Sequence, residues 1–193
     1  MKRLGVFCGS NRGANPVFAD AARNLGTLLA QRNIELVFGG SHVGLMGVVA
    51  DAVLAGGGHA IGVLPRFMQE KELAHPNLTT LHLVDTMHER KQLMAELADG
   101  FVALPGGYGT FEEIFEAITW GQLHLHDCPC GLLNVAGYYD ALVQFLRQAV
   151  TAGFVRPAQF ESLIVSDTPG DLLERFLNFQ PDRSEKWFKT DLI

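Results

Sequence analysis

The sequence contains little cysteine, and it has no apolar run long enough to span a membrane. Three cysteines in 193 residues are an odd number for a disulfide framework, so we expect reduced thiols and a cytoplasmic protein. A membrane-spanning helix needs about 18 consecutive apolar residues, and no stretch approaches that length. The apolar residues that follow Met1-Lys2-Arg3 stop at Gly9, which is too early for a secretory signal peptide.

Basic residues are in the minority, since 15 Lys and Arg stand against 21 Asp and Glu. The net charge of -6 argues against bulk electrostatic binding to nucleic acid or to anionic membranes. Two nucleotide-binding motifs are also missing. The chain has no GxxxxGK[ST] loop, which disfavours a phosphotransferase. The turn Gly9–Gly13 lacks the dinucleotide fingerprint, and Gly39-Gly40 stands where an NAD site needs an acidic residue, so we expect no NAD.

Short apolar runs alternate with amphipathic segments along nearly the whole chain. The runs show no polar alternation, which is typical of parallel strands buried on both faces. The order predicts one α/β domain: a Rossmann-like, doubly wound, mainly parallel sheet with helices on both faces. We expect this domain at residues 1–180 and a tail or docking segment at 181–193, which carries Trp187-Phe188. The expected strands are 4–8, 34–38, 60–64, 79–84, 101–104, 131–135 and 163–165, and the expected helices are 16–31, 45–54, 87–98, 111–125, 138–151 and 171–179.

Three glycine-bearing turns follow strands of this sheet, at Gly9-Ser10, at Gly39–Gly44 and at Gly106–Thr110. In open α/β sheets ligands bind outside the carboxyl ends of the strands. Because these turns all lie at carboxyl ends, we expect them to face one crevice.

The chain is organised around the stretch Pro105–Glu113, which reads PGGYGTFEE. Its glycines let the backbone approach a ligand closely, and Thr110 can cap the following helix, whose free N–H groups bind phosphate. Glu112 and Glu113 suit the dipole of a helix start, which would be a purely structural role. Two acids beside a phosphate cradle also indicate a carboxylate that acts on the rest of the ligand. The stretch therefore predicts a phosphate cradle with an adjacent acid.

A second candidate is the segment from Asp85 to Lys91. Asp85 or Thr86 can cap a helix whose first turns carry Arg90 and Lys91. A solvated face would explain this pair of cations, but the helix begins at the carboxyl end of a strand, so both can reach the same crevice. Cations there would contact phosphate or a leaving group.

The segment from His124 to Cys130 contains His-x-His and Cys-x-Cys, which are residue types that bind zinc. However, Cys130 opens an apparently buried strand, and Pro129 restricts the loop between Cys128 and Cys130. A structural zinc site needs four converging ligands, so we expect no metal here.

Taken together, four motifs resemble the LOG ("lonely guy") family. They are the PGGxGTxxE stretch Pro105–Glu113, its companion Met87–Lys91, the turn Val6–Ser10 and the run Gly39–Gly47, in which Ser41 stands where the family usually has glycine. The resemblance covers Leu4 to Phe179. It implies a metal-independent homodimeric hydrolase without cofactor, which cleaves the N-glycosidic bond of nucleoside 5′-monophosphates, including N6-substituted cytokinin forms, into free base and ribose 5-phosphate. The family's older label, lysine decarboxylase, does not suit a chain that offers no Schiff-base lysine for pyridoxal phosphate.

The resemblance also implies roles for individual residues. Glu113 matches the catalytic carboxylate and Arg90 the catalytic arginine. Glu72 and Thr119 fall at substrate-contact positions, although the sequence alone favours a surface glutamate at Glu72 and packing would explain Thr119 equally well. The other implied substrate-binding residues are Lys91, Gly107, Tyr108, Gly109, Thr110, Phe111 and Glu112.

The sequence leaves two alternatives open, one about turnover and one about the surroundings of Trp120. A nucleotide sensor or carrier could use the same cradle without turnover, although binding alone needs no carboxylate near the sugar. Trp120 lies away from the line of Ile114 and Ile118, so it contacts either a partner or the loop at residues 124–129. With the resemblance, we expect a two-fold dimer with active sites near the interface. The sequence does not show the preferred base, nor whether the role is hormone production or nucleotide salvage.

Overall fold

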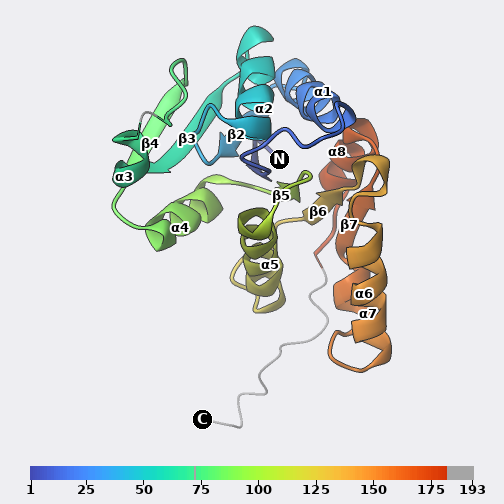
Figure 1. Ribbon diagram of the computed structural model, residues 1–193. Coiled ribbons are helices and arrows are strands. Elements are labelled where there is room, and N and C mark those ends of the chain that lie inside the picture. Colours follow the sequence, from blue (N-terminus) through green and yellow to red (C-terminus); the bar gives the residue numbers. More distant parts are fainter. Residues whose placement is uncertain (72, 182–193) are drawn as a thin grey trace.

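A computed structural model describes residues 1–71 and 73–181, and it confirms the predicted α/β fold (Figure 1). Seven strands form one sheet in the order β4-β3-β2-β1-β5-β6-β7, and every neighbouring pair is parallel. The strands are β1 Arg3–Phe7, β2 Glu35–Phe38, β3 Ala60–Pro65, β4 Thr80–Val84, β5 Phe101–Ala103, β6 Cys130–Leu133 and β7 Leu163–Ser166. The helices are α1 Val17–Gln31, α2 Gly44–Ala55, α3 Arg66–Gln69, α4 Met87–Leu97, α5 Tyr108–Gln122, η1 Val135–Gly137, α6 Asp140–Thr151, α7 Pro157–Glu161 and α8 Pro169–Leu177.

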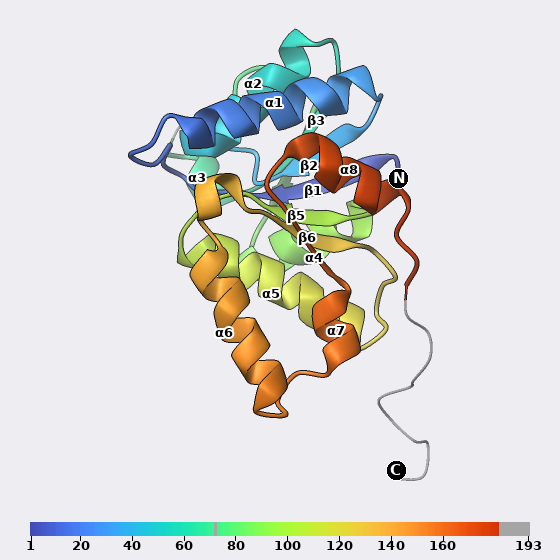
Figure 2. The same cartoon turned by 90° about the vertical axis from the view of Figure 1, so that its right-hand side faces the viewer.

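The helices cover both faces of the sheet, as Figure 2 shows. Helices α1, α2 and α8 pack on one face and α4, α5 and α6 on the other. Successive residues of a strand point to opposite faces, and β1 illustrates this: Val6 belongs to the first core and Phe7 to the second. Both faces are therefore buried, which is why the strands read as continuous apolar runs. None of the described helices is long and apolar enough to cross a membrane.

The sheet order reverses between β1 and β5, and the three glycine turns meet at that point. The N–H of Gly9 donates to the carbonyl of Pro105 at 3.1 Å, and the carbonyl of Gly9 accepts from the N–H of Leu45 at 3.0 Å. A side chain at Gly9 would lie 3.3 Å from the Cα of Gly106. The three turns therefore lie together, as expected, at the switch point where open α/β sheets bind ligands.

Most element bounds agree closely with the sequence prediction, and four elements differ from it. Helix α5 begins at Tyr108, before the expected start. The expected helix from Tyr138 is preceded by the short 3-10 turn η1, in which Ala136 has a φ of 51°. The connection after β3 contains α3, and the segment before β7 contains α7, which begins at Pro157, a residue suited to a first helical turn. The tail with Trp187-Phe188 lies outside the described residues.

Candidate active site

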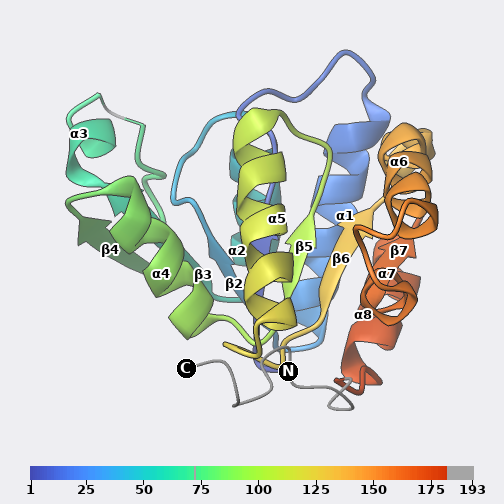
Figure 3. The ribbon, with the colours of Figure 1, turned by 90° about the horizontal axis from the view of Figure 1, so that it is seen from below.

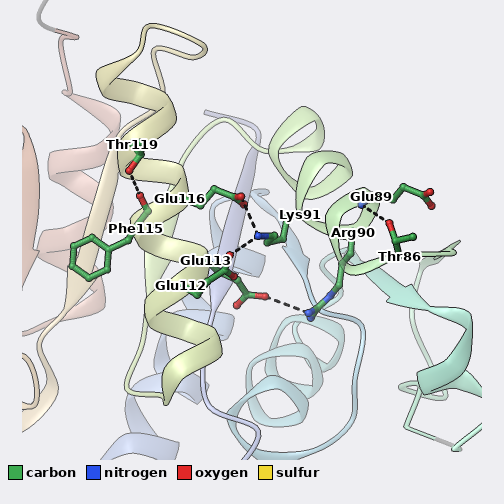
Figure 4. Close-up of polar contacts among 9 residues, drawn as sticks. All are labelled: Thr86, Glu89, Arg90, Lys91, Glu112, Glu113, Phe115, Glu116 and Thr119. Atoms are coloured by element: carbon green, nitrogen blue, oxygen red, sulfur yellow. Dashed lines mark hydrogen bonds and ion pairs between the residues drawn. The ribbon is translucent and has the colours of Figure 1, made fainter.

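Arg90 is held at the crevice by the start of α4 (Figure 4). Of the two predicted caps, Thr86 is the one used: its hydroxyl accepts the N–H of Glu89 at 3.1 Å. The carboxylate of Glu89 in turn accepts the N–H of Asp85 at 2.9 Å, so the helix start is fixed from both sides. Arg90 follows in the first turns and is only 7% exposed. Its Nε donates to the carbonyl of Val63 in β3 at 3.1 Å, which directs the guanidinium towards α5.

Glu113 meets this guanidinium from the opposite side of the crevice. Its Oε1 lies 3.3 Å from Nη1 of Arg90, and both side chains are largely buried. Burial raises the pKa of the Glu113 carboxyl, and the charge of Arg90 opposes that rise. A buried carboxylate beside a fixed arginine is suited to stabilise a developing positive charge.

Lys91 joins α4 to the other two acids of α5. Its Nζ pairs with the carboxylate of Glu112 and lies 3.0 Å from Oε1 of Glu116. Burial lowers the pKa of Lys91, but the hydrogen bonds that Lys91 donates to Glu112 and Glu116 outweigh this effect and raise its pKa overall. Lys91 therefore neutralises the acid next to Glu113.

The predicted cradle forms the entry to α5. Gly107 stands just before the helix, and nothing lies within 4 Å of a Cβ placed at Gly107 or Gly109, so the space above the turn is open. Tyr108 is 93% exposed at the rim. Thr110 was expected to cap the helix, and this is wrong. It lies inside the first turn and is buried, because its side chain fills the space beneath Gly106. The open helix start remains a suitable anion site.

Two tyrosines that the sequence analysis missed hold the cradle from below. The hydroxyl of Tyr139 donates to the carbonyl of Leu104 at 2.7 Å, and that of Tyr138 donates to the carbonyl of Gly106. These carbonyls lie on either side of Pro105. The N–H of Tyr139 donates to Oδ1 of Asn134 at 2.7 Å, which fixes the pair at the end of β6. Their position after a neighbouring strand of the same sheet was the signal that could have revealed them.

Gly39 makes room for Arg90. A Cβ at this position would overlap Nη2 of Arg90, so the guanidinium fits here because the residue that follows β2 is glycine. Cys8 follows β1 close to the same pair, and burial raises the pKa of its thiol well above the ordinary value. Cys8 is therefore a packed, unreactive thiol rather than a nucleophile.

The remaining predicted residues are not brought to the Arg90–Glu113 pair. Thr119 is exposed, donates to the carbonyl of Phe115 at 2.7 Å, and projects away from the crevice. Phe111 is partly buried in the core, where it packs edge-on against Tyr139. Glu72 lies outside the described residues.

The histidine–cysteine segment is not arranged as a metal site. Nε2 of His126 donates to the carbonyl of Ala117 at 2.9 Å, and Nδ1 accepts the N–H of Cys128 at 3.1 Å, so both ring nitrogens are used. Burial raises the pKa of Cys130 to about 12. Within residues 1–71 and 73–181, no three His, Cys, Asp or Glu side chains are grouped to hold a metal ion.

The contact between Gly39 and Arg90 generates a prediction about the electrostatics of the site. In Gly39→Ala the new methyl group displaces the flexible end of Arg90, so the protein folds but Glu113 loses its cation. The pKa of Glu113 should then rise further, because the charged form is no longer stabilised. Titration of the glutamate carboxyl groups by 13C NMR measures this. Gly170→Ala is the matched control, since nothing lies within 4 Å of a Cβ there. An unchanged pKa of Glu113 in Gly39→Ala would show that a side chain at position 39 does not displace Arg90 from Glu113.

Solved structures with the same fold include carriers of a metal cofactor. The molybdenum cofactor binding protein from Rippkaea orientalis has a TM-score of 0.69 and 20% identity, with 91% of this chain and 95% of that chain covered. The molybdenum cofactor carrier protein from Chlamydomonas reinhardtii has a TM-score of 0.67 and 19% identity, with 92% and 98% covered. At such identities the similarity shows the fold alone.

Sequence relatives are much more similar. The probable cytokinin riboside 5′-monophosphate phosphoribohydrolase LOGL2 of Oryza sativa subsp. japonica is 46% identical over 95% of this chain and 75% of its own length. LOG3 of Arabidopsis thaliana, a cytokinin riboside 5′-monophosphate phosphoribohydrolase, is 46% identical over 93% of this chain and 84% of its own length. A family model described as "Possible lysine decarboxylase" matches residues 46–176. With this match and these identities, the chain belongs to the family of the LOG phosphoribohydrolases.

Proposed function

We propose that this protein hydrolyses the N-glycosidic bond of nucleoside 5′-monophosphates, including N6-substituted adenosine forms, to free base and ribose 5-phosphate. The observation that carries the proposal is the buried Arg90–Glu113 pair directly beside an open glycine cradle. The relatives' names, which describe phosphoribohydrolases of cytokinin riboside 5′-monophosphates, support it.

The geometry suits the chemistry of glycosidic cleavage. The bond breaks through an oxocarbenium-like sugar, so a carboxylate near the anomeric carbon stabilises the transition state and orients the attacking water. Glu113 takes that role. Arg90 keeps Glu113 in place and supplies positive charge for the departing base. The residues themselves supply these groups, and the proposed mechanism requires no metal or cofactor.

The cradle holds the 5′-phosphate. Gly107, Tyr108, Gly109 and Thr110 present the start of α5 to the phosphate, where free N–H groups and the helix dipole favour an anion. The acids that follow would repel it if they were unpaired. Because Lys91 pairs with Glu112 and Arg90 with Glu113, that repulsion is offset.

The remaining contacts belong to a proposed homodimer with active sites near its interface. Thr119 projects away from Arg90 and Glu113 of its own chain. It would therefore contact the substrate that is bound in the second protomer. Trp120 is partly buried and lines a small space with Lys91 and Ala95, between helices α4 and α5, which both lie on the side of the sheet seen in Figure 3. A partner packed over α4 and α5 would cover Trp120. Glu72, Lys91, Phe111 and Glu112 complete the proposed binding residues, and reduced cysteines suit a cytoplasmic location.

A non-catalytic nucleotide sensor or carrier is the alternative, because the same cradle could bind a nucleotide without turnover. Incubation with AMP separates the two proposals. A hydrolase releases adenine and ribose 5-phosphate in equal amounts with turnover, whereas a carrier binds AMP and releases it unchanged.

Glu113→Gln should fold and bind AMP but lose about 100-fold or more of kcat, the scale for removal of a preorganised electrostatic group. Adenine release and AMP binding measure the two properties separately. Glu116→Gln is the matched control, because Glu116 lies one turn further along α5 and pairs only with Lys91 among its described partners. Near wild-type turnover by Glu113→Gln would refute the assigned role.

Adenosine should be a very poor substrate beside AMP. Binding energy from the phosphate, which is remote from the bond that breaks, positions the sugar for reaction. Comparison of kcat/KM for AMP and adenosine measures the effect. Comparable values for both would show that the glycine turn is not a phosphate site.

Sedimentation at low micromolar concentration should give about twice the chain mass of 21.1 kDa. Trp120→Glu should shift the protein towards monomer, because a charge in an apolar interface is costly to bury. Phe154→Glu is the control: Phe154 is 89% exposed and lies after α6. A fully active monomer, or dissociation caused only by Phe154→Glu, would contradict an interface on α4 and α5.

A further inference from the structure

A cavity of about 480 Å³ lies at the end of the sheet opposite the proposed active site. It opens beside the first residues of β6 and β7, Cys130 and Leu163, whereas the cradle lies at the carboxyl ends of the strands. The end of α5 and the start of α7 complete its walls through Ile118 and Pro157. Because the strands are parallel, their amino ends and carboxyl ends lie at opposite edges of the sheet. The proposed mechanism therefore uses no residue of this cavity.

The cavity is lined by both apolar and polar side chains. Ile118, Leu163 and Phe179 supply apolar surface, and Gln122 and Gln159 supply amide groups. This composition is typical of a site that binds an amphipathic group, with aromatic rings inside and a hydrogen-bonded edge.

The path of the chain identifies the occupant. After α8 ends at Leu177, the chain passes Phe179 and Pro181, and both line the cavity. The described residues end there, and residues 182–193 follow directly. Their sequence, DRSEKWFKTDLI, places Trp187-Phe188 among charged residues. Six residues span at most roughly 20 Å, so both aromatic residues can reach a cavity whose wall contains Pro181.

We propose that residues 182–193 of the same chain dock in this cavity, with Trp187 and Phe188 as the anchors. Each aromatic side chain buries about 150–250 Å² when it is covered, which gives the segment two large apolar contacts. Covalent attachment at Pro181 makes docking intramolecular, so the effective concentration of the segment is high. Docking there places the aromatic pair over Cys128, which lines the cavity.

The thiol of Cys128 provides the test in the full-length protein. Cys128 is half-buried and lines the cavity, whereas Cys8 is buried at the other end of the sheet and serves as an internal reference. The rate of alkylation by N-ethylmaleimide at each cysteine is measured by peptide mass spectrometry. In the double variant Trp187→Ser/Phe188→Ser, labelling of Cys128 should increase tenfold or more, with Cys8 still protected.

The matched control is Lys186→Ser/Lys189→Ser, which changes the two residues flanking the aromatic pair. This variant should label like the wild type. Equal rates for wild type and the aromatic variant would overturn the proposal, and so would a control variant that labels as fast as the aromatic one. Turnover of AMP should change less than twofold in both variants, because the cavity lies away from the proposed active site.

Two further measurements distinguish other occupants. Protection of Cys128 should not depend on protein concentration, and loss of protection on dilution would assign the cavity to the segment of a second copy. In Trp120→Phe the remaining tryptophan is Trp187, since the chain has two. Its emission should be blue-shifted and resistant to acrylamide. Emission typical of exposed tryptophan would also overturn docking.

Discussion

The candidate active site depends on one buried cation, the guanidinium of Arg90. The carbonyl of Val63 in β3 fixes the position of the guanidinium, and Gly39, which follows β2, leaves room for it. Glu113 on α5 supplies the opposite charge. Removal of one partner from a buried ion pair costs about 3–5 kcal/mol, because it leaves an uncompensated charge. The pair therefore couples two helices and two strands to one geometry. A site built in this way tolerates little change at any of the positions that hold Arg90.

The cradle is fixed by a different kind of contact. A glycine-rich turn is open to a ligand on one side, and it gains little stability from its own side chains. Tyr138 and Tyr139 compensate from the other side by donating to the carbonyls that flank Pro105. Edge-on packing of Phe18 against Tyr138 links this support to α1. Glycines line the open side of the turn, and aromatic residues hold the backbone on its other side.

The sequence predicted the fold and the centre of the site because both depend on strong local signals. Continuous apolar runs such as Val6-Phe7 indicate buried parallel strands, and the glycines after them indicate where the carboxyl ends lie. The sequence also places Arg90 and Glu113 at the same edge of the sheet, since each follows a strand that ends there, and the structure adds the contact between them. The roles of individual binding residues, Thr119 among them, remain predictions.

What the sequence analysis missed depends on contacts between distant residues. Nothing local to Gly39 shows that an arginine 51 positions later in the chain occupies the space beside it. The same applies to Tyr139, whose hydroxyl reaches Leu104, a residue of a different connection. Thr110 was misplaced because a threonine at a helix start favours capping, but here tertiary packing under Gly106 decides its position. Local propensity predicts elements, and long-range packing decides which residues support the site.

The order of the strands has a consequence for how the protein is made. The central strand β1 leaves the ribosome first, but one of its two neighbours, β5, is separated from it by about a hundred residues, with Gly5 opposite Phe101. Pairings across such a separation form slowly, because a long loop must close before any contact compensates for it. Until β5 and α5 emerge, one edge of β1 lacks its partner and Arg90 has no counter-ion. Nascent chains of this protein should therefore be most vulnerable to aggregation, and most dependent on chaperones, after β1 has emerged and before β5 and α5 follow.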